Sequence, residues 1–181
     1  MNTLLHICCA PCAIECIDSL RAEGQALTGF WFNPNIHPVT EYRARLDAMK
    51  GYAETVNLPL LGHDRYGLRD FVRAVSENLD DRCGACYAMR LDAAAGFAAA
   101  NGFEAFTTTL LISPYQNREL RLATGRRAAR AHGVKFLERD FRPRFREGQR
   151  RARELALYMQ KYCGCVFSEE ERYHPKPDEL G

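Results

Sequence analysis

Residues 3–33, TLLHICCAPCAIECIDSLRAEGQALTGFWFN, contain the pattern that decides the fold. The apolar run at 3–7 predicts a β-strand, and the run at 27–33 predicts a second one. Between them, residues 13–23 predict a helix that ends at Gly24. A helix that joins two strands returns the chain to the edge where the first strand began, so the two strands should be parallel.

The same alternation of short apolar runs and amphipathic stretches continues along the chain. We expect further strands at 58–61, 103–111 and 134–137, and helices at 41–56, 68–77, 83–100, 119–132 and 149–162. This order predicts a single Rossmann-like α/β domain over residues 1–173, with a parallel sheet flanked by helices. A cysteine-containing helical segment should close the domain, followed by a flexible tail at 174–181. Ligands of such sheets bind beyond the carboxyl ends of the strands, where the cysteines after the first strand should lie.

Length and composition exclude several classes of protein. At 181 residues, with 46% hydrophobic and 27% charged residues, the chain is long enough to bury a core without disulfides. It contains no apolar run of about 18 residues and no basic, apolar leader, so we expect a cytoplasmic protein that does not enter a membrane. Neither a G-x-x-x-x-G-K-[ST] loop nor a G-x-G-x-x-G motif occurs, so nothing indicates ATP or NAD binding.

Eight cysteines stand in three groups. In a cytoplasmic chain that builds its own core, such grouping indicates metal or redox chemistry more than a disulfide scaffold. The first group, Cys8, Cys9 and Cys12, follows the first strand, and Pro11 is suited to begin a helix. Free N–H groups at a helix start favour the thiolate, which is the form that binds metal. Cys16 is expected to be a buried small apolar side chain.

The second group, Cys83 and Cys86, is a C-x-x-C pair at the start of a predicted helix. With Cys8 and Cys9 it can supply four thiolates, the ligand set of either zinc or a [4Fe–4S] cluster. Spacing alone does not separate these two centres, and a thioredoxin-like redox pair is the rival interpretation.

The third group is a C-x-C pair formed by Cys163 and Cys165. A disulfide between them would close a very small ring, which predicts strain and easy reduction and therefore suits a redox role. Gly164 supplies the backbone freedom that such a ring needs. The alternative is that the two thiols are further metal ligands.

The basic residues are concentrated in one segment. Residues 118–153 contain 13 Lys and Arg against four Asp and Glu, although the net charge of the whole chain is only +2. Such a segment indicates a polyanionic partner such as nucleic acid, although arginine-rich helix faces are also often simply solvated. Residues 107–116, TTTLLISPYQ, offer polar side chains to a ligand, or are just a strand and a turn. His6 and His37 could bind substrate or metal, but lone histidines are more often structural.

Five blocks of sequence together resemble a known family. They are HICCAPC at 6–12, RCGACYAMRL at 82–91, TTTLLISPYQ at 107–116, DFRPRF at 140–145 and YMQKYCGCVFS at 158–168. In this order, over nearly the whole chain, they resemble the QueH type of epoxyqueuosine reductase. The resemblance implies an α/β core like that of adenine-nucleotide hydrolases, and a [4Fe–4S] cluster. It also implies reduction of the epoxide of epoxyqueuosine to an alkene at the wobble position of tRNA, with an external electron donor.

The resemblance also implies roles for individual residues. Cys8, Cys9, Cys83 and Cys86 match the cluster ligands, and Cys163 and Cys165 fall where the family has a redox-active disulfide. The family is also described with a second iron, held partly by cysteines and an aspartate, so Cys12 could serve either centre. The residues expected to bind the tRNA substrate are Tyr115, Gln116, Arg142, Arg144 and Arg146.

Two other classes of protein remain open at this point. A structural zinc protein that binds RNA without catalysis would use the same four thiolates, and zinc in such a site is redox-silent. A metal-free thiol–disulfide oxidoreductase would need only a reactive C-x-x-C pair. The paired Cys8 and Cys9 and the C-x-C pair fit the iron–sulfur oxidoreductase better than either.

Overall fold

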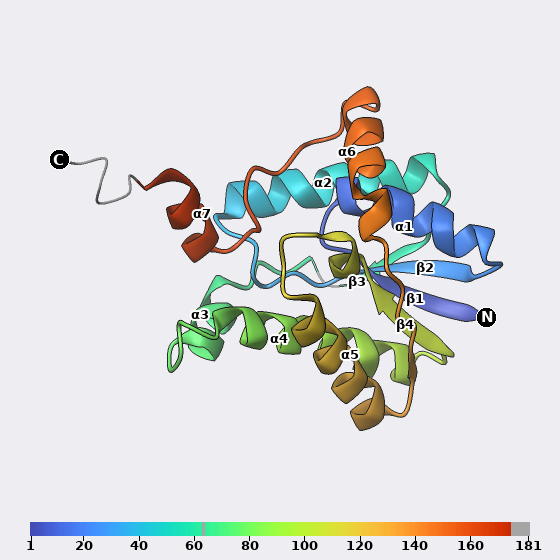
Figure 1. The fold of residues 1–181 in the computed structure, drawn as a ribbon, viewed down its shortest axis with the longest axis horizontal. Coiled ribbons are helices and arrows are strands. Elements are labelled where there is room, and N and C mark those ends of the chain that lie inside the picture. The colour runs from blue at the N-terminus through green and yellow to red at the C-terminus, as the bar shows by residue number, and fades with distance from the viewer. Residues whose placement is uncertain (63, 175–181) are drawn as a thin grey trace.

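A five-stranded parallel sheet forms the centre of the protein, seen in a computed structural model that describes residues 1–62 and 64–174 (Figure 1). The strand order is β3-β2-β1-β4-β5, so the direction of winding reverses between β1 and β4. This reversal is the switch point of the fold, and it lies beside the end of the first strand. The strands are β1 Asn2–His6, β2 Ala26–Trp31, β3 Leu60–Gly62, β4 Ala105–Thr108 and β5 Lys135–Phe136.

Helices cover both faces of the sheet (Figure 1). One face is covered by α1 (Ala10–Ala22), α2 (Val39–Thr55) and α6 (Phe145–Glu154). The other is covered by α3 (Leu68–Val75), α4 (Arg82–Ala100) and α5 (Arg118–His132). The last helix, α7 (Val166–Tyr173), lies near the start of α2, and the 3-10 turns η1 (Thr109–Ile112) and η2 (Arg142–Arg144) complete the elements.

Burial on both faces explains why the strands are apolar throughout. Successive side chains of a strand point to opposite faces, so Leu4 packs among the residues under α4 while Leu5 packs among those under α1. Both are 0% exposed. The predicted parallel α/β sheet is therefore confirmed. No helix within residues 1–62 and 64–174 is long and apolar enough to span a membrane.

Two predicted elements are wrong in part. The strand expected at 103–111 ends at Thr108, because the Thr108 side chain accepts a hydrogen bond from Leu110 N (3.1 Å) and starts the turn η1. The helix expected at 149–162 ends at Glu154, and Ala156 then adopts a left-handed conformation with φ 51°. The predicted tail lies outside the described residues from 175 onward, so its boundary stays a prediction.

Residues 155–165 instead form an irregular segment that tertiary contacts hold in place. The guanidinium of Arg45, on α2, donates to the carbonyl oxygens of Tyr162 (3.0 Å) and Cys163 (2.9 Å). These two bonds fix the backbone at the end of the segment to α2. The third cysteine group therefore arrives on a loop and opens α7, with Cys165 as the residue that precedes its first turn.

Candidate metal centre

The first cysteine group lies at the carboxyl end of β1, beside the switch point, as predicted. Cys8 follows the strand, Cys9 precedes the first turn of α1, and Cys12 lies within that turn, which contains Pro11. The three sulfur atoms lie within 4.8 Å of one another, and Cys8 Sγ and Cys9 Sγ are 3.7 Å apart. The turn from the end of β1 to the start of α1 thus brings the sulfur atoms of Cys8, Cys9 and Cys12 together.

Side chains from distant segments hydrogen-bond to these sulfurs. Thr109 Oγ1 donates to Cys8 Sγ at 3.2 Å. Gln160 Nε2, from the irregular segment, donates to Cys9 Sγ at 3.0 Å and lies 3.8 Å from Cys12 Sγ. Donors of this kind stabilise negative charge on sulfur, so the site is built for thiolates.

Hydrogen bonds among the three thiols couple their pKa values. Donation from Cys12 and Cys9 holds the pKa of the Cys8 thiol well below its usual range. The same bond to Cys8 raises the pKa of Cys12, whereas burial is the main reason that the pKa of Cys9 is raised. A metal ion would replace the shared protons and allow all three sulfurs to be anionic.

The donor set fits a thiophilic metal. Three thiols converge, two of them buried and Cys8 partly buried, and soft thiolates are the ligands of zinc, iron and iron–sulfur centres. The separation of 3.7 Å between Cys8 Sγ and Cys9 Sγ is close to the edge of a tetrahedron with metal–sulfur bonds of about 2.3 Å, roughly 3.8 Å. In a cluster each sulfur binds a different iron, so these thiols would move apart to hold one.

The second and third groups lie together. Cys86, on the first turns of α4, and Cys165 pack in one apolar cluster with Phe71 and Val75, and both cysteines are 9% exposed. Burial raises the pKa of the Cys86 thiol to about 12. Cys83, by contrast, is exposed. The structure places Cys86 and Cys165 in one apolar cluster, which their positions in the sequence did not indicate.

The C-x-C pair is present as two free thiols. Gly164, between them, has φ 146°, a backbone conformation that favours glycine, in agreement with the flexibility expected of it. Cys163 is exposed, and its sulfur accepts a hydrogen bond from Gln116 Nε2 at 3.3 Å. Electrostatic interactions connect Cys163 with Cys8 and with Cys86. Among the described residues, Cys8, Cys9 and Cys12 are the thiols that converge within ligand distance, and the predicted ligands Cys83 and Cys86 do not join them in this arrangement.

The two histidines and Cys16 have structural roles. His6 is completely buried, with Nδ1 2.8 Å from Thr108 Oγ1 and Nε2 3.2 Å from the Phe32 carbonyl oxygen. Burial, helped by the charge of Arg90, lowers the pKa of His6 to about 3, so the ring is neutral. His37 is also buried and bonds to the Pro34 carbonyl. Cys16 is 0% exposed in the core, so its predicted role as a small apolar side chain is confirmed.

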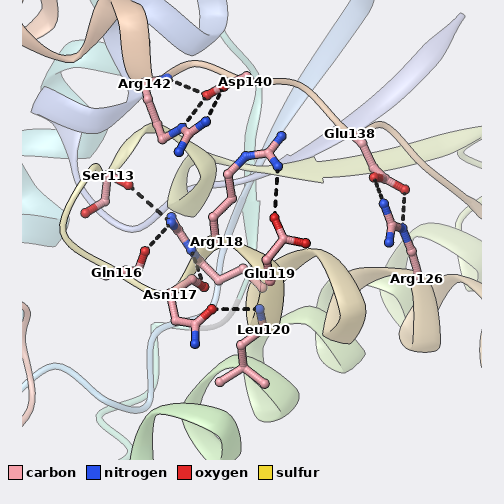
Figure 2. Close-up of polar contacts among 11 residues, drawn as sticks. Ser113, Gln116, Asn117, Arg118, Glu119, Leu120, Arg126, Glu138, Asp140 and Arg142 are labelled. Carbon is pink, nitrogen blue, oxygen red and sulfur yellow. Dashed lines mark hydrogen bonds and ion pairs between the residues drawn. The ribbon is translucent and has the colours of Figure 1, made fainter.

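The rim of the site is aromatic and basic. Tyr115 is 84% exposed, and its ring packs edge-on against Phe145 with centroids 5.6 Å apart. Figure 2 shows Arg118 paired with Glu119, at 3.4 Å, and Arg142 paired with Asp140. Arg142 pairs with Asp140 at 2.6 Å and holds the pKa of that carboxyl down to about 2.

The other arginines of the basic segment are also mostly paired. Figure 2 shows Arg126 bonded to Glu138, at 2.5 Å. Arg144 reaches Glu15, a carboxylate that is 2% exposed on α1, at 3.2 Å. Arg146 has no ion pair within residues 1–62 and 64–174. Part of the positive charge of residues 118–153 is therefore neutralised by carboxylates within the protein.

Residues that sequence reasoning missed are Thr109, Gln160, Asn33 and Arg90. Asn33 Nδ2 donates to the Ile7 carbonyl oxygen (2.9 Å), just before the first cysteines, and Asn33 Oδ1 accepts from Arg90 Nη2 (2.8 Å). The one available signal was periodicity, because Arg90 stands four residues after Cys86 and so shares its helix face.

A parallel sheet with converging thiols at its switch point defines a Rossmann-like α/β protein with a cysteine triad that can bind a metal. The match to the epoxyqueuosine reductase QueH family spans residues 3–171, and the chain belongs to that family. It is similar to Epoxyqueuosine reductase QueH of Dehalococcoides mccartyi, with 38% identity over 94% of this chain and 93% of that protein. It is also similar to the Thermotoga maritima protein of the same name, with 37% identity over 94% and 92% of the two chains.

Solved structures of other proteins share the fold. The U34-tRNA thiolase NcsA from Methanococcus maripaludis superposes with a TM-score of 0.58 and 12% identity, covering 93% of this chain and 61% of the thiolase. A predicted subunit of tRNA methyltransferase from Methanocaldococcus jannaschii gives a TM-score of 0.54 and 11% identity, covering 98% and 94%. At such low identity the likeness concerns the fold alone, and it agrees with the expected Rossmann-like α/β fold.

Proposed function

We propose that the chain reduces the epoxide of epoxyqueuosine at the wobble position of tRNA, the last step in the formation of queuosine. Both carbon–oxygen bonds of the epoxide break, a double bond forms between the two ring carbons, and the oxygen leaves as water. The balance requires two electrons and two protons. The observation that carries the proposal is the convergence of Cys8, Cys9 and Cys12 beside the switch point of the sheet, in a chain of this family.

The metal centre we propose is a [4Fe–4S] cluster with Cys8, Cys9, Cys83 and Cys86 as ligands. Cys12 Sγ lies within 4.8 Å of both Cys8 Sγ and Cys9 Sγ, so Cys12 is placed to bind the same cluster or an additional iron. The thiolase from M. maripaludis carries such a cluster on a related fold, which supports the choice. When bound, the centre supplies electrons and a Lewis acid for the epoxide oxygen.

Cys163 and Cys165 can supply what the reaction consumes. Two thiols that join in a disulfide release two electrons and two protons, which matches the reduction of one epoxide. An external donor must then reduce the disulfide before the next turnover. Cys163 is exposed, and Cys165 belongs to the same apolar cluster as Cys86, which supports a pair that exchanges electrons with the metal centre and with an external donor.

The role of the pair is tested by replacing one sulfur. Cys163→Ser should keep the iron content of the wild type and lose multiple turnover. Cys16→Ala is the matched control, because it removes a buried thiol that the reaction does not use. Full turnover by Cys163→Ser with an intact cluster would remove the dithiol from the mechanism.

The rim suits single-stranded RNA. The exposed ring of Tyr115, supported by Phe145, can stack on an unpaired base. Gln116 Nε2 bonds to Cys163, and Gln116 Oε1 is buried with no hydrogen-bond partner in the described part of the chain, which supports Oε1 as an acceptor for a substrate hydroxyl.

Phosphates would be bound by Arg142, Arg144 and Arg146. Arg146 has no carboxylate partner among the described residues. Arg142 would leave its ion pair with Asp140 to bind a phosphate, and Arg144 would leave its ion pair with Glu15. If about six phosphates are bound, log K should fall with log salt at a slope of roughly −4. A flat response to salt would refute this RNA contact.

The first experiment measures iron, acid-labile sulfide and zinc per chain in protein purified without oxygen. The same sample is then incubated with reductant and an anticodon stem-loop that contains epoxyqueuosine, and the nucleosides are identified by mass spectrometry. Iron with matching sulfide and formation of queuosine support the proposal. Zinc without sulfide would indicate a structural RNA-binding protein, and metal-free protein with a reactive Cys83 would indicate a thiol–disulfide oxidoreductase. The substrate and the free thiols suit a cytoplasmic enzyme.

A further inference from the structure

Arg90 is a buried cation among the three cysteine groups. It lies on α4, one turn after Cys86, and is 2% exposed. Its Nη2 donates to Asn33 Oδ1 at 2.8 Å, its Nη1 lies 3.9 Å from Cys86 Sγ, and its Nε has no hydrogen-bond partner among residues 1–62 and 64–174. Its charge interacts with Cys8 and Cys163 as well as with Cys86.

The charge of Arg90 is not compensated by a carboxylate in the part of the chain that the structure describes. Arg45, which is equally buried, bonds to Glu41 at 2.7 Å. Arg121 also lacks a carboxylate, but four backbone carbonyl oxygens surround its guanidinium. Arg90 has one amide oxygen and otherwise faces sulfur. A buried, unpaired charge costs several kcal/mol, so a folded protein rarely keeps one without an anion nearby.

We propose that Arg90 is the counter-ion of the metal centre, a positioning residue whose charge stabilises anionic sulfur at Cys8 and Cys86 and raises the reduction potential of the centre. The inference rests on the thiolate-bound centre of the proposed function. Thiolate ligation leaves negative charge in a buried site, and reduction adds to it, so a fixed cation nearby favours the reduced form. Asn33 holds the guanidinium in place and links it to the backbone just before Cys8.

Two substitutions remove the net positive charge by different routes. Arg90→Met deletes the cation and keeps a side chain of similar length. Asn33→Asp leaves Arg90 in place but puts a carboxylate where Asn33 Oδ1 now lies, 2.8 Å from Nη2. Arg90→Lys keeps the charge. Arg130→Met, on the exposed side of α5, is the matched control for a change of one unit in the charge of the whole protein.

The experiment uses the whole iron-loaded protein and each variant. A dye-mediated redox titration under nitrogen, followed by the spectrum of the reduced cluster, gives the midpoint potential. Iron retention against a chelator gives the stability of the centre, and thermal unfolding is measured on metal-free samples. We expect more negative potentials in Arg90→Met and Asn33→Asp, and loss of iron about 10- to 100-fold faster in Arg90→Met. Arg90→Lys and Arg130→Met should stay near the wild type in potential.

The metal-free samples separate a counter-ion from a structural residue. Without the metal the buried cation lacks most of its compensation, so metal-free Arg90→Met should unfold at the wild-type temperature or above it. Wild-type potential and iron retention in Arg90→Met would overturn the proposal, and so would equal destabilisation of metal-free Arg90→Met and Arg90→Lys. Wild-type protein that binds no iron would instead refute the metal centre itself, and the role of Arg90 with it.

Discussion

Arg45 offers the sharpest test of how the third cysteine group is positioned. Its Nε bonds to Glu41 at 2.7 Å, both side chains are less than 10% exposed, and its two terminal nitrogens bind the carbonyl oxygens of Tyr162 and Cys163. Arg45→Met removes all of these bonds and leaves Glu41 buried without its cation. Breaking a buried pair from one side costs about 3–5 kcal/mol. For a chain of this size we expect a fall in melting temperature of about 10 °C.

A second substitution separates the two contributions of Arg45. Glu41→Gln removes the stranded charge and keeps an acceptor for the Tyr158 hydroxyl, which bonds to Glu41 Oε2. The double variant Arg45→Met, Glu41→Gln should therefore recover about 1–3 kcal/mol of stability relative to Arg45→Met alone. It should not recover the position of the loop, because the carbonyls of Tyr162 and Cys163 still lack their donor.

The assays follow stability and loop position separately. Urea unfolding, followed by circular dichroism, gives the free energy of unfolding for the wild type, both single variants and the double variant. Reaction of Cys163 with a thiol reagent, identified by peptide mass spectrometry, should be faster in both variants that lack Arg45. Two results would refute this account of Arg45. One is that the free energies of Arg45→Met and Glu41→Gln simply add in the double variant. The other is that Cys163 reacts at the wild-type rate when Arg45 is absent.

Three further predictions concern single side chains. Gln160→Leu should weaken metal retention about 10-fold or more, since it removes the donor to Cys9 Sγ, and unchanged iron content under a chelator would contradict this. Tyr115→Ala should weaken binding of the stem-loop by about 1–3 kcal/mol with no change in melting temperature, measured by titration of labelled RNA. Burial, with the Glu41 charge, raises the pKa of Tyr162 to about 12, from about 10 in the unfolded chain. The neutral Tyr162 hydroxyl should thus contribute fully to stability below pH 10, and this contribution should be lost as the pH rises toward 12. Urea unfolding measures it: the free energies of unfolding of the wild type and Tyr162→Phe should converge between pH 10 and pH 12.

Local pattern was enough for most of the elements. Thr3 to Asn33 alternates a short apolar run, an amphipathic stretch and a second apolar run, and these became β1, α1 and β2 within a few residues. The alanine-rich stretch after Cys83 became α4 in the same way. Such patterns are reliable because apolar periodicity and helix ends depend on neighbours within one or two turns.

Local pattern failed where a distant residue competes for the backbone. The stretch 149–162 has helical composition, yet its helix ends at Glu154, and Arg45, more than 100 positions away in the chain, binds the carbonyls of Tyr162 and Cys163 in the segment that follows. The arginines of 118–153 looked free in the sequence, but Arg144 and Arg151 both bond to Glu15, a buried carboxylate on α1. Neither contact has a signal in the nearby residues.

The sequence by itself determined the class of fold, the three cysteine groups and, through five ordered motifs, the family, because each depends on residue type and short spacing. The tertiary structure decided how the cysteines are grouped in space: Cys12 joins Cys8 and Cys9, and Cys165 shares an apolar cluster with Cys86. It also decided that Gln160 and Arg90 face those sulfurs. Burial and long-range contacts set these positions, and they depend on how the helices pack on the sheet rather than on any one segment of the chain.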